Sequence, residues 1–249
     1  MSIRNEQLND RIALITGGAR RVGRHLAKAM AAEGIRVVVH YNQSRVDAES
    51  LVGEIENEGG SVALVQGDLT DSEVAQGLIG EAAQLFGPLN ILINNASFFA
   101  PGDPLETTLE EWKRYQAIHA DAPFLLSREF ARQITADTDG VIINMNDWRA
   151  GRPGPDHFGY TMSKVTLHGL TQSLAQALGP LGVRVCELAL GAVLPPEGGE
   201  DGYLHTLRNE IPTRRFPTLD DVASSLLFVL RTPALNGETI HIYGGRHQG

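Results

Sequence analysis

The most constraining feature of this sequence is a regular alternation between short apolar runs and longer amphipathic stretches. The runs are rich in Val, Ile and Leu and nearly continuous, which is typical of β-strands that are buried on both faces of a parallel sheet. We expect seven strands, over Ile12–Ile15, Ile35–His40, Ser61–Gln66, Asn90–Asn94, Val141–Met145, Val183–Leu190 and Thr239–Tyr243.

The stretches between these runs repeat their apolar residues with the period of an amphipathic helix, about 3.6 residues. Strands that alternate with such helices imply right-handed crossovers, which place helices on both faces of a parallel sheet. The sequence therefore predicts an α/β fold, a doubly wound seven-stranded parallel sheet, with residues 1–249 in one domain. The expected helices are Val22–Glu33, Val46–Glu58, Glu73–Phe86, Leu109–Ile134, His157–Leu178 and Leu219–Leu230.

One stretch, Ala192–Pro217, breaks this pattern because prolines and glycines interrupt it throughout its first half. A compact domain seldom contains an irregular connection of this length unless it has a function. We therefore expect residues 192–217 to form a substrate loop or lid. The residues that interrupt it are Pro195, Pro196, Gly198, Gly199 and Gly202.

The acidity and the cysteine content of the chain exclude several classes of protein. The formal net charge of −9 and the pI of about 5.3 argue against binding to nucleic acid or to an anionic membrane. The single cysteine, Cys186, allows neither an internal disulfide nor a zinc cluster, and we expect no metal. Because the segment Met1–Asp10 is polar and no apolar run could span a membrane, we expect a cytoplasmic protein.

A glycine-rich turn follows the first expected strand and leads directly into a helix. The turn reads Thr16-Gly17-Gly18-Ala19-Arg20-Arg21-Val22-Gly23. Gly17 permits a tight turn, Gly23 allows the helix to pack closely on the strand, and the N–H groups at the helix start face an anion. The turn predicts a site for the phosphates of a dinucleotide, although a plain strand–helix connection would share some of these features.

The end of the second expected strand, Val38–Arg45, indicates which dinucleotide is bound. A site for NAD normally has Asp or Glu here to bind the ribose 2′-hydroxyl, and this segment has neither. Arg20, His40 and Ser44 are available instead to bind a 2′-phosphate. The sequence therefore predicts NADPH as the cofactor.

Asp68 follows the third expected strand, and two roles are open to it. Its carboxylate can bind the adenine amino group of the cofactor. It can equally cap the helix that begins near Ser72.

A candidate catalytic set follows the fourth and fifth expected strands. The segment Asn94-Asn95-Ala96-Ser97 and Asp147 come at strand ends, where a parallel sheet binds its ligands. Tyr160 and Lys164 are four residues apart and share one face of a helix. An ammonium group nearby would favour the phenolate and lower the tyrosine pKa from its usual value of about 10. Taken alone, this spacing also occurs by chance on helix surfaces.

The order of these motifs, TGxxxxxG, NNA and YxxxK, resembles the short-chain dehydrogenase/reductase family over essentially the whole chain. The resemblance implies a single Rossmann-like domain with a seven-stranded parallel sheet in a dimer or tetramer, and we expect a homotetramer. It also implies that Tyr160 is the proton donor. Lys164 would lower the tyrosine pKa and hold the nicotinamide ribose.

Several residues depart from the common pattern of that family. Taken together, the departures resemble the pteridine reductases and the bacterial dihydromonapterin reductases, both of which reduce pterins with NADPH. They are Arg21 at the middle glycine, Asp147 at the catalytic serine, His119 at the asparagine of the long helix, Ser97 before Phe98 and Phe99, and Leu190-Gly191 in place of Pro-Gly.

The resemblance to the pteridine reductases assigns a role to most of these residues. Arg21 would contact the cofactor phosphates and face the pterin, Ser97 would bind the substrate by a hydrogen bond, and Phe99 would stack on the pterin ring. A carbonyl reductase needs a hydroxyl to bind the substrate oxygen. A pterin C=N bond instead needs a proton on nitrogen, which a carboxyl group at Asp147 can hold or relay to Tyr160.

Five positions keep a second interpretation at this stage. His119 is either part of a proton relay or a packing residue, and Trp148 either lines the substrate cleft or simply packs. By the same resemblance, Arg246 would reach the active site of a neighbouring subunit. Phe99, Arg21 and Asp147 could also serve structure alone, as a core residue, a solvated helix-start residue and a turn cap respectively.

Motifs and resemblance together predict an NADPH-dependent pteridine reductase that acts on dihydropterins such as dihydrobiopterin or dihydromonapterin, with dihydrofolate and oxidised pterins as further candidate substrates. The alternatives are a carbonyl or 3-oxoacyl reductase and a non-catalytic NADPH-sensing module, against which Tyr160 and Lys164 both count. The expected cofactor-binding residues are Gly17, Arg20, Arg21, Val22, Gly23, His40, Tyr41, Asn42, Ser44, Asp68, Leu69, Asn95, Ala96, Ser97, Tyr160, Lys164 and Gly191. The expected substrate-binding residues are Arg21, Ser97, Phe99, Asp147, Trp148, Tyr160 and Leu194, and the catalytic ones are Asp147, Tyr160 and Lys164.

Overall fold

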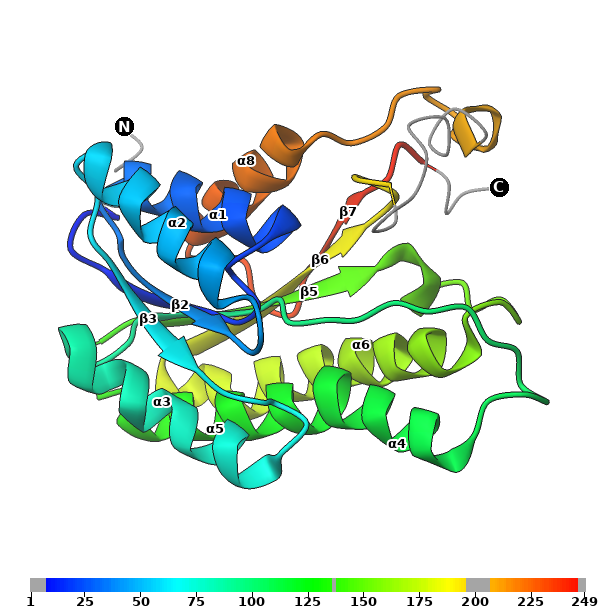
Figure 1. The fold of residues 1–249 in the computed structure, drawn as a ribbon, viewed down its shortest axis with the longest axis horizontal. Helices are drawn as coiled ribbons and strands as arrows, with labels where there is room; N and C mark the ends of the chain where they lie inside the picture. The colour runs from blue at the N-terminus through cyan, green and yellow to red at the C-terminus, as the bar shows by residue number, and fades with distance from the viewer. Residues whose placement is uncertain (1–7, 136–137, 196–206, 246–249) are drawn as a thin grey trace.

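The computed structural model describes residues 8–135, 138–195 and 207–245, and it contains one parallel sheet between two layers of helices (Figure 1). The strands lie in the order β3-β2-β1-β4-β5-β6-β7, and every pair of neighbours is parallel. This confirms the predicted α/β fold. The strands are β1 (Ile12–Ile15), β2 (Arg36–Tyr41), β3 (Val62–Gln66), β4 (Ile91–Asn94), β5 (Gly140–Asp147), β6 (Val183–Leu190) and β7 (Thr239–Ile242).

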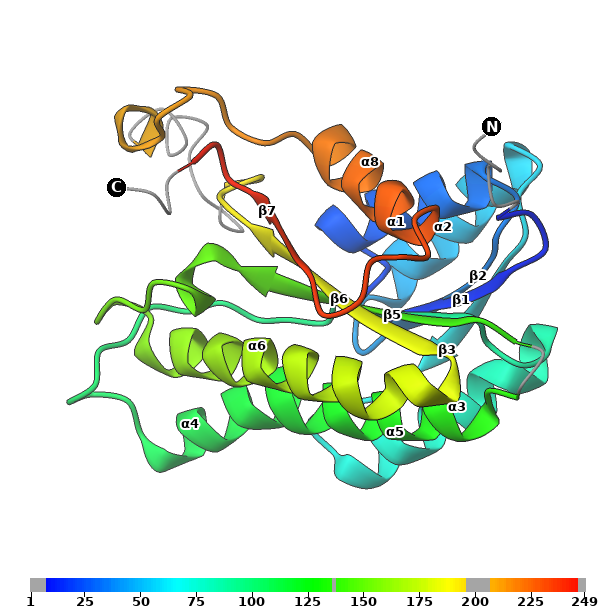
Figure 2. The ribbon, with the colours of Figure 1, turned by 180° about the vertical axis from the view of Figure 1, so that it is seen from behind.

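The helices divide between the two faces of the sheet, and both views of the ribbon agree on this (Figures 1 and 2). One face is covered by α1 (Arg21–Ala32), α2 (Arg45–Asn57) and α8 (Leu219–Leu230). The other is covered by α3 (Ser72–Phe86), α4 (Leu109–Gln116), α5 (Ala122–Gln133) and α6 (Phe158–Leu178). Short helical turns lie at η1 (Ala117–Asp121), η2 (Trp148–Ala150), η3 (Gly179–Leu181) and η4 (Arg208–Glu210).

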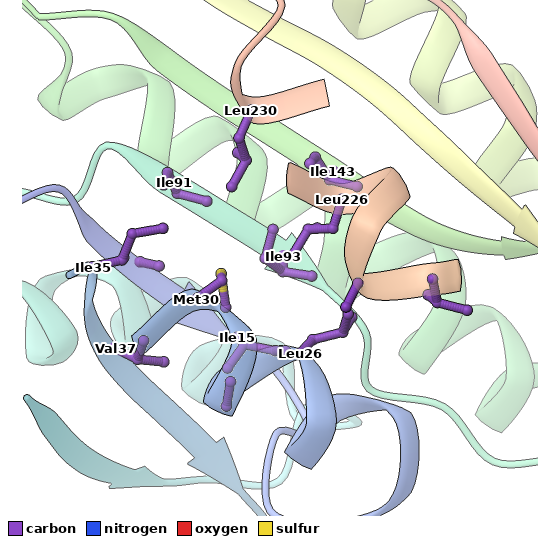
Figure 3. Packing of buried hydrophobic residues seen from close by; sticks show 14 of the residues in the cluster. Ile15, Leu26, Met30, Ile35, Val37, Ile91, Ile93, Ile143, Leu226 and Leu230 are labelled. Carbon is purple, nitrogen blue, oxygen red and sulfur yellow. The ribbon is translucent and has the colours of Figure 1, made fainter. Parts of the chain in front are cut away.

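The core on the α1/α8 face shows why the central strands consist almost entirely of aliphatic residues. Leu26 and Met30 of α1 and Leu226 of α8 pack on Ile15 and Ile93 of the sheet, and all five are fully buried (Figure 3). Burying a side chain of this size contributes roughly 1.5–3 kcal/mol. The opposite face has its own buried cluster, so both faces of β1 and β4 lie away from solvent.

The adjacent strands β1 and β4 form the point at which the order of the sheet reverses. Chain connections leave β1 and β4 toward opposite sides there, and open parallel sheets bind ligands in the resulting crevice. The glycine-rich turn follows β1, and the segment with Ser97 follows β4. The strand order therefore brings together two motifs that lie far apart in the sequence.

The structure differs from the sequence prediction within Leu109–Ile134, which is not one continuous α-helix. It consists of α4, the π-helical turn η1 and α5. A π-turn inserts one extra residue into a helix and rotates the side chains that follow it. His119 lies in this turn and is 1% exposed, so the interruption turns its ring toward the protein interior.

One further difference concerns the end of a strand. The strand β5 continues beyond Met145 to Asp147, because its last residues pair in register with β6 as far as Leu190.

The expected substrate loop 192–217 is described only at 192–195 and 207–217, and Arg246 lies outside the described residues. Among the residues that are described, no helix is both long and apolar enough to cross a membrane.

Candidate active site

The glycine-rich turn is held in place by the segment that follows β4. The Asn95 side-chain amide donates to the carbonyl oxygens of Thr16 and Gly17, at 2.8 and 3.1 Å. In return, the Thr16 hydroxyl oxygen accepts from the backbone N–H groups of Asn95 and Ala96. A Cβ on Gly23 would lie 2.5 Å from the Gly17 carbonyl oxygen, so no larger residue fits there. The expected cofactor residues Asn95 and Gly23 thus shape the turn.

Arg21 occupies the position of a common glycine and keeps a backbone conformation that favours glycine. Its φ is +52°, in the left-handed region that costs other residues about 1–2 kcal/mol. Its guanidinium Nη2 donates to the carbonyl oxygen of Pro195, just after Leu194. The side chain therefore spans from the start of α1 to the described beginning of the expected substrate loop. Arg21 and Ser97 are exposed, whereas Leu194 is half-buried against the core.

His40 differs from the expectation that it binds a 2′-phosphate. Its ring is 2% exposed, Nδ1 accepts from the N–H of Gly17, and Nε2 lies 3.0 Å from the carbonyl oxygen of Gly67. Both nitrogens are therefore used within the protein, and burial lowers the His40 pKa to about 4. An uncharged buried ring is not a phosphate ligand, and His40 instead braces the glycine-rich turn against the end of β3.

Three of the four other residues expected at the end of β2 lie near the surface. Arg20 and Asn42 are exposed and Ser44 is half-buried, while the Arg20 Nε lies 3.7 Å from the Asp47 carboxylate. Tyr41 is buried and packs with Ala19 and Ala48. Arg20, Asn42 and Ser44 therefore lie at the surface beyond the end of β2, where the ribose side of a cofactor was expected.

Asp68 does not cap α3, which settles one of its two open roles. The N-cap is Asp71, whose carboxylate accepts from the N–H groups of Glu73 and Val74. Asp68 instead accepts through Oδ1 from the N–H and the hydroxyl of Thr70. These hydrogen bonds lower the Asp68 pKa, so the side chain is an exposed carboxylate beside the buried Leu69.

The catalytic candidates meet where β5 ends and α6 begins. The Tyr160 hydroxyl donates to Asp147 Oδ2 at 3.0 Å, and Asp147 Oδ1 accepts from the backbone N–H of Arg149 at 2.9 Å. The Lys164 Nζ donates to the carbonyl oxygen of Met145 at 2.8 Å and lies 5.7 Å from the Tyr160 ring centre. The structure therefore brings Asp147, Tyr160 and Lys164 together.

The protonation of Tyr160 differs from the expectation of a lowered pKa. Burial and the negative charge of Asp147 raise the Tyr160 pKa well above its usual value. Burial also lowers the Lys164 pKa to about 8, although Asp147 and Glu187 act in the opposite direction. The Lys164 ammonium group binds Met145 and not the phenol, so Tyr160 holds its proton and donates it to a carboxylate.

Glu187 of β6 places a second carboxylate behind this group. It is 1% exposed and accepts hydrogen bonds from the Asn146 amide at 2.9 Å and the Thr239 hydroxyl at 2.9 Å, and it pairs with the His168 ring at 2.6 Å. Its charge favours the protonated form of Lys164. Glu187 was not predicted from the sequence, because nothing local in the sequence shows that β6 places it near Lys164.

Phe99 lies beside the catalytic pair and is not a core residue, since 43% of it is exposed. Its ring stacks on His157 at 4.2 Å between ring centres and meets Tyr160 edge to face at 4.8 Å. The Arg149 guanidinium lies 5.8 Å from the Phe99 ring centre and 4.9 Å from that of Trp148. The exposed part of Phe99 therefore offers an aromatic surface beside the Tyr160 hydroxyl.

Arg149 is a further site residue that was not predicted from the sequence. Its Nη1 lies 3.7 Å from Asp147, and its Nη2 donates to Asp156 at 2.9 Å. It holds the short segment between β5 and α6 and places a positive charge beside Asp147. Its position two residues after Asp147 was the only available signal, and that spacing predicts contact only once η2 is known to be a tight turn.

His119 joins the segment after β4 to α6. Its Nε2 lies 2.8 Å from the hydroxyl oxygen of Ser97, and its Nδ1 lies 2.8 Å from that of Ser163. Its ring meets the Tyr160 ring edge to face at 5.4 Å. His119 is therefore hydrogen-bonded on both sides and is more than a packing residue.

Comparison with known proteins identifies the family. The model for short chain dehydrogenases matches residues 11–200. This chain belongs to the short-chain dehydrogenase/reductase family. A 3-oxoacyl-[acyl-carrier-protein] reductase, FabG of Staphylococcus aureus, is 28% identical over 239 residues, which cover 94% of this chain and 97% of the relative.

Solved structures of family members share the fold closely. The FolM alternative dihydrofolate reductase 1 of Brucella canis, complexed with NADP, has a TM-score of 0.90 and 31% identity, and the match covers 98% of this chain and 97% of that one. A short-chain dehydrogenase of Burkholderia cenocepacia, in complex with NADP, has a TM-score of 0.89 and 30% identity over 97% of this chain and 99% of that one. This protein is therefore an oxidoreductase of that family.

Two expected cofactor-binding residues remain, Gly191 and Val22, and packing in this short-chain dehydrogenase explains the first of them. Its N–H donates to the carbonyl oxygen of Ile242, and a Cβ there would lie 2.6 Å from the Cβ of Tyr243. The close approach of β7 to the end of β6 therefore requires glycine. Val22 is half-buried in the first turn of α1.

Proposed function

We propose that this protein is an NADPH-dependent reductase of pterins. The observation that carries the proposal is the hydrogen bond from the Tyr160 hydroxyl to the Asp147 carboxylate, beside the half-exposed ring of Phe99. Reduction of a C=N bond requires a proton on nitrogen as hydride reaches the neighbouring carbon. A phenol held by a carboxylate can provide that proton, and Phe99 offers a surface on which a flat heterocycle can stack.

The first turn of α1 fits the phosphates of the cofactor. The helices α3, α4 and α8 are capped by Asp71, Thr108 and Thr218, whereas the N-cap residue of α1, Arg20, makes no side-chain cap hydrogen bond. The first turn of α1 also contains no acidic residue. Its N–H groups and its dipole therefore favour an anion.

The end of β2 supports NADPH over NADH, since Arg20 and Ser44 lie at the surface where a carboxylate would otherwise select NAD. Two solved structures with the same fold were determined with NADP. When bound, NADPH supplies the hydride. The residues of this chain bind and orient the two reactants, and they supply the proton.

Within this proposal, each catalytic residue has one task. Asp147 accepts the Tyr160 hydrogen bond and so fixes where the hydroxyl lies before reaction. Tyr160 delivers its proton to the ring nitrogen when the hydroxyl turns from Asp147 to the substrate. Lys164 would bind the nicotinamide ribose through its ammonium group. Its positive charge stabilises the phenolate that forms when Tyr160 loses its proton. Arg21 and Ser97 contact the pterin from the exposed side.

A second candidate is a 3-oxoacyl reductase, which the similarity to FabG favours. That reaction would use the same Tyr160 and Lys164, and it would place a carbonyl oxygen near Tyr160. Asp147 counts against it, because a carboxylate that accepts a hydrogen bond repels the oxygen on which negative charge develops.

The deciding experiment measures NADPH oxidation with 7,8-dihydrobiopterin, dihydromonapterin, dihydrofolate, a simple ketone and a 3-oxoacyl thioester, and repeats it with NADH. We expect turnover of at least one pterin and preference for NADPH. Tyr160→Phe should reduce kcat by at least about 100-fold, and Asp147→Ser should abolish pterin turnover while NADPH still binds. Reduction of the ketone or thioester without any pterin would reject the proposal in favour of the second candidate.

A further inference from the structure

A continuous chain of hydrogen bonds runs from Ser97 through His119 to Ser163 and the backbone of Tyr160. The distances are 2.8 Å from Ser97 Oγ to His119 Nε2, 2.8 Å from His119 Nδ1 to Ser163 Oγ, and 2.7 Å from Ser163 Oγ to the Tyr160 carbonyl oxygen. Ser97 is exposed, whereas His119 and Ser163 are buried. This chain of hydrogen bonds therefore begins at the surface of the site and ends inside α6.

The inner end of the chain fixes the direction of every hydrogen bond in it. A carbonyl oxygen only accepts, so the single hydroxyl proton of Ser163 is donated to Tyr160. The Ser163 oxygen can then only accept from the ring, and His119 must carry a proton on Nδ1. A neutral imidazole has one N–H, so its Nε2 accepts, and the hydroxyl of Ser97 must donate to it.

The surroundings of His119 keep its ring neutral. The ring is 1% exposed, and desolvation together with the positive charge of Lys164 lowers the His119 pKa well below its usual value. A second proton on the ring would reverse the bond to Ser97, so neutrality is required for the direction derived above. Because the chain ends at a carbonyl oxygen, it orients hydroxyl groups and does not carry protons to Tyr160.

We propose that His119 is a positioning residue that makes Ser97 a hydrogen-bond acceptor toward the ligand. The only proton of Ser97 is committed to His119, so toward any other group the Ser97 oxygen offers lone pairs alone. The site then favours a ligand that presents an N–H group at this point. Amino-substituted and partly reduced pterins have such groups, and simple ketones have none. The selectivity, though not the tautomer of His119, rests on the proposed function.

The tautomer can be measured directly on the whole protein, without any substrate. In ¹⁵N-histidine-labelled protein, we expect a pyrrole-type shift at Nδ1 and a pyridine-type shift at Nε2 of His119. Loss of this pair of signals in His119→Gln assigns it among the eight histidines of the chain, and its displacement in Ser97→Ala assigns it independently. A protonated Nε2, or a doubly protonated ring at neutral pH, would overturn the proposal.

The inner serine provides the decisive variant, because it does not face the ligand. Ser163→Ala removes the acceptor of the Nδ1 proton, so the proton should shift toward Nε2 and the Ser97 hydroxyl should turn outward. The matched control is Ser127→Ala in α5, which removes a fully buried hydroxyl that makes no hydrogen bond within the described part of the chain. An unchanged tautomer in Ser163→Ala would contradict the derived direction.

Kinetics with 7,8-dihydrobiopterin test the consequence for the ligand. Losing one oriented hydrogen bond should raise KM in Ser163→Ala about threefold to tenfold. The expected change in kcat is small, and Ser127→Ala should change neither constant. If the tautomer shifts and KM does not, Ser97 is not selecting the ligand. If no pterin is reduced at all, the proposed function fails, whereas the spectrum still decides the role of His119.

Discussion

Lys164 carries a buried positive charge that should cost the protein stability. Burial lowers its pKa from the usual 10.5 to about 8, even with Asp147 and Glu187 nearby. A difference of about 2.5 pKa units corresponds to about 3 kcal/mol against the ammonium form at neutral pH. Replacing the side chain with methionine, Lys164→Met, removes the charge from a cavity of similar shape. It also removes one hydrogen bond to Met145, worth about 1 kcal/mol.

We therefore expect Lys164→Met to be more stable than the original protein at pH 7, by roughly 2 kcal/mol, and to have lost its reductase activity. The difference should depend on pH with a defined sign. Below pH 8 the lysine is charged in both the folded and the unfolded state, so the full cost is present. Between pH 8 and 10.5 the folded state holds a neutral amine while the unfolded chain is still protonated, so the original protein gains stability relative to the variant as pH rises.

Urea unfolding of both proteins without cofactor, at pH 7.0 and pH 9.5, measures this. The stability advantage of Lys164→Met should shrink by about 2 kcal/mol between the two pH values. Lys113→Met, at an exposed lysine of α4, is the control and should show no such dependence. If Lys164→Met is less stable than the original protein at pH 7, and the difference stays constant to pH 9.5, then the buried Lys164 ammonium group does not destabilise the folded protein.

Three further substitutions test other parts of the site. His40 is neutral in the folded protein, with a pKa of about 4, so the stability that it contributes is lost as pH falls from 6.5 through 4. Between pH 7 and 4.5, the free energy of unfolding measured with urea should therefore fall by about 2 kcal/mol less in His40→Gln than in the original protein. Arg21→Gly relieves a left-handed backbone, so the free energy of unfolding should hold or rise, by up to about 1 kcal/mol, while KM for the pterin increases. Glu187→Gln removes a negative charge that supports the Lys164 ammonium, so the alkaline fall of kcat/KM, expected near pH 8, should move to lower pH. A profile that does not move would separate Glu187 from catalysis.

The strand and helix pattern was predictable because it is local. Ile12–Ile15, Val183–Leu190 and Leu219–Leu230 have the bounds expected from apolar periodicity, and a capping box at Thr218 fixes the start of the last of these. The doubly wound, seven-stranded parallel sheet followed from the crossover rule and the resemblance, whereas the order of its strands came only from the structure. These features depend on neighbours in the sequence, so a single chain is enough to predict them.

The chemistry of the site depends on contacts between distant segments, and here the sequence predictions were incomplete. The partners of His119 lie 22 and 44 residues away, and the π-turn that aims its ring cannot be seen in the helical period. The polar pattern at the end of β2 suggested a phosphate ligand at His40, but its burial depends on β3 and the glycine-rich turn. The Tyr160 pKa was expected to fall because Lys164 is one turn away, yet desolvation and Asp147 determine its direction.

Three of the five departures from the common family pattern change the hydrogen-bonding groups or the charge that the site presents to a ligand. At Arg21 the backbone keeps the conformation a glycine would have, and a guanidinium is added at the edge of the site. At Asp147 a hydroxyl that donates is replaced by a carboxylate that accepts from Tyr160. At His119 a ring bonded on both sides commits the only proton of Ser97 inward. The last two changes remove hydrogen-bond donors that a carbonyl oxygen would need, and they add acceptors that N–H groups can meet. A ligand rich in N–H groups gains from both changes, whereas a simple ketone loses from both, so the departures favour the same class of substrate.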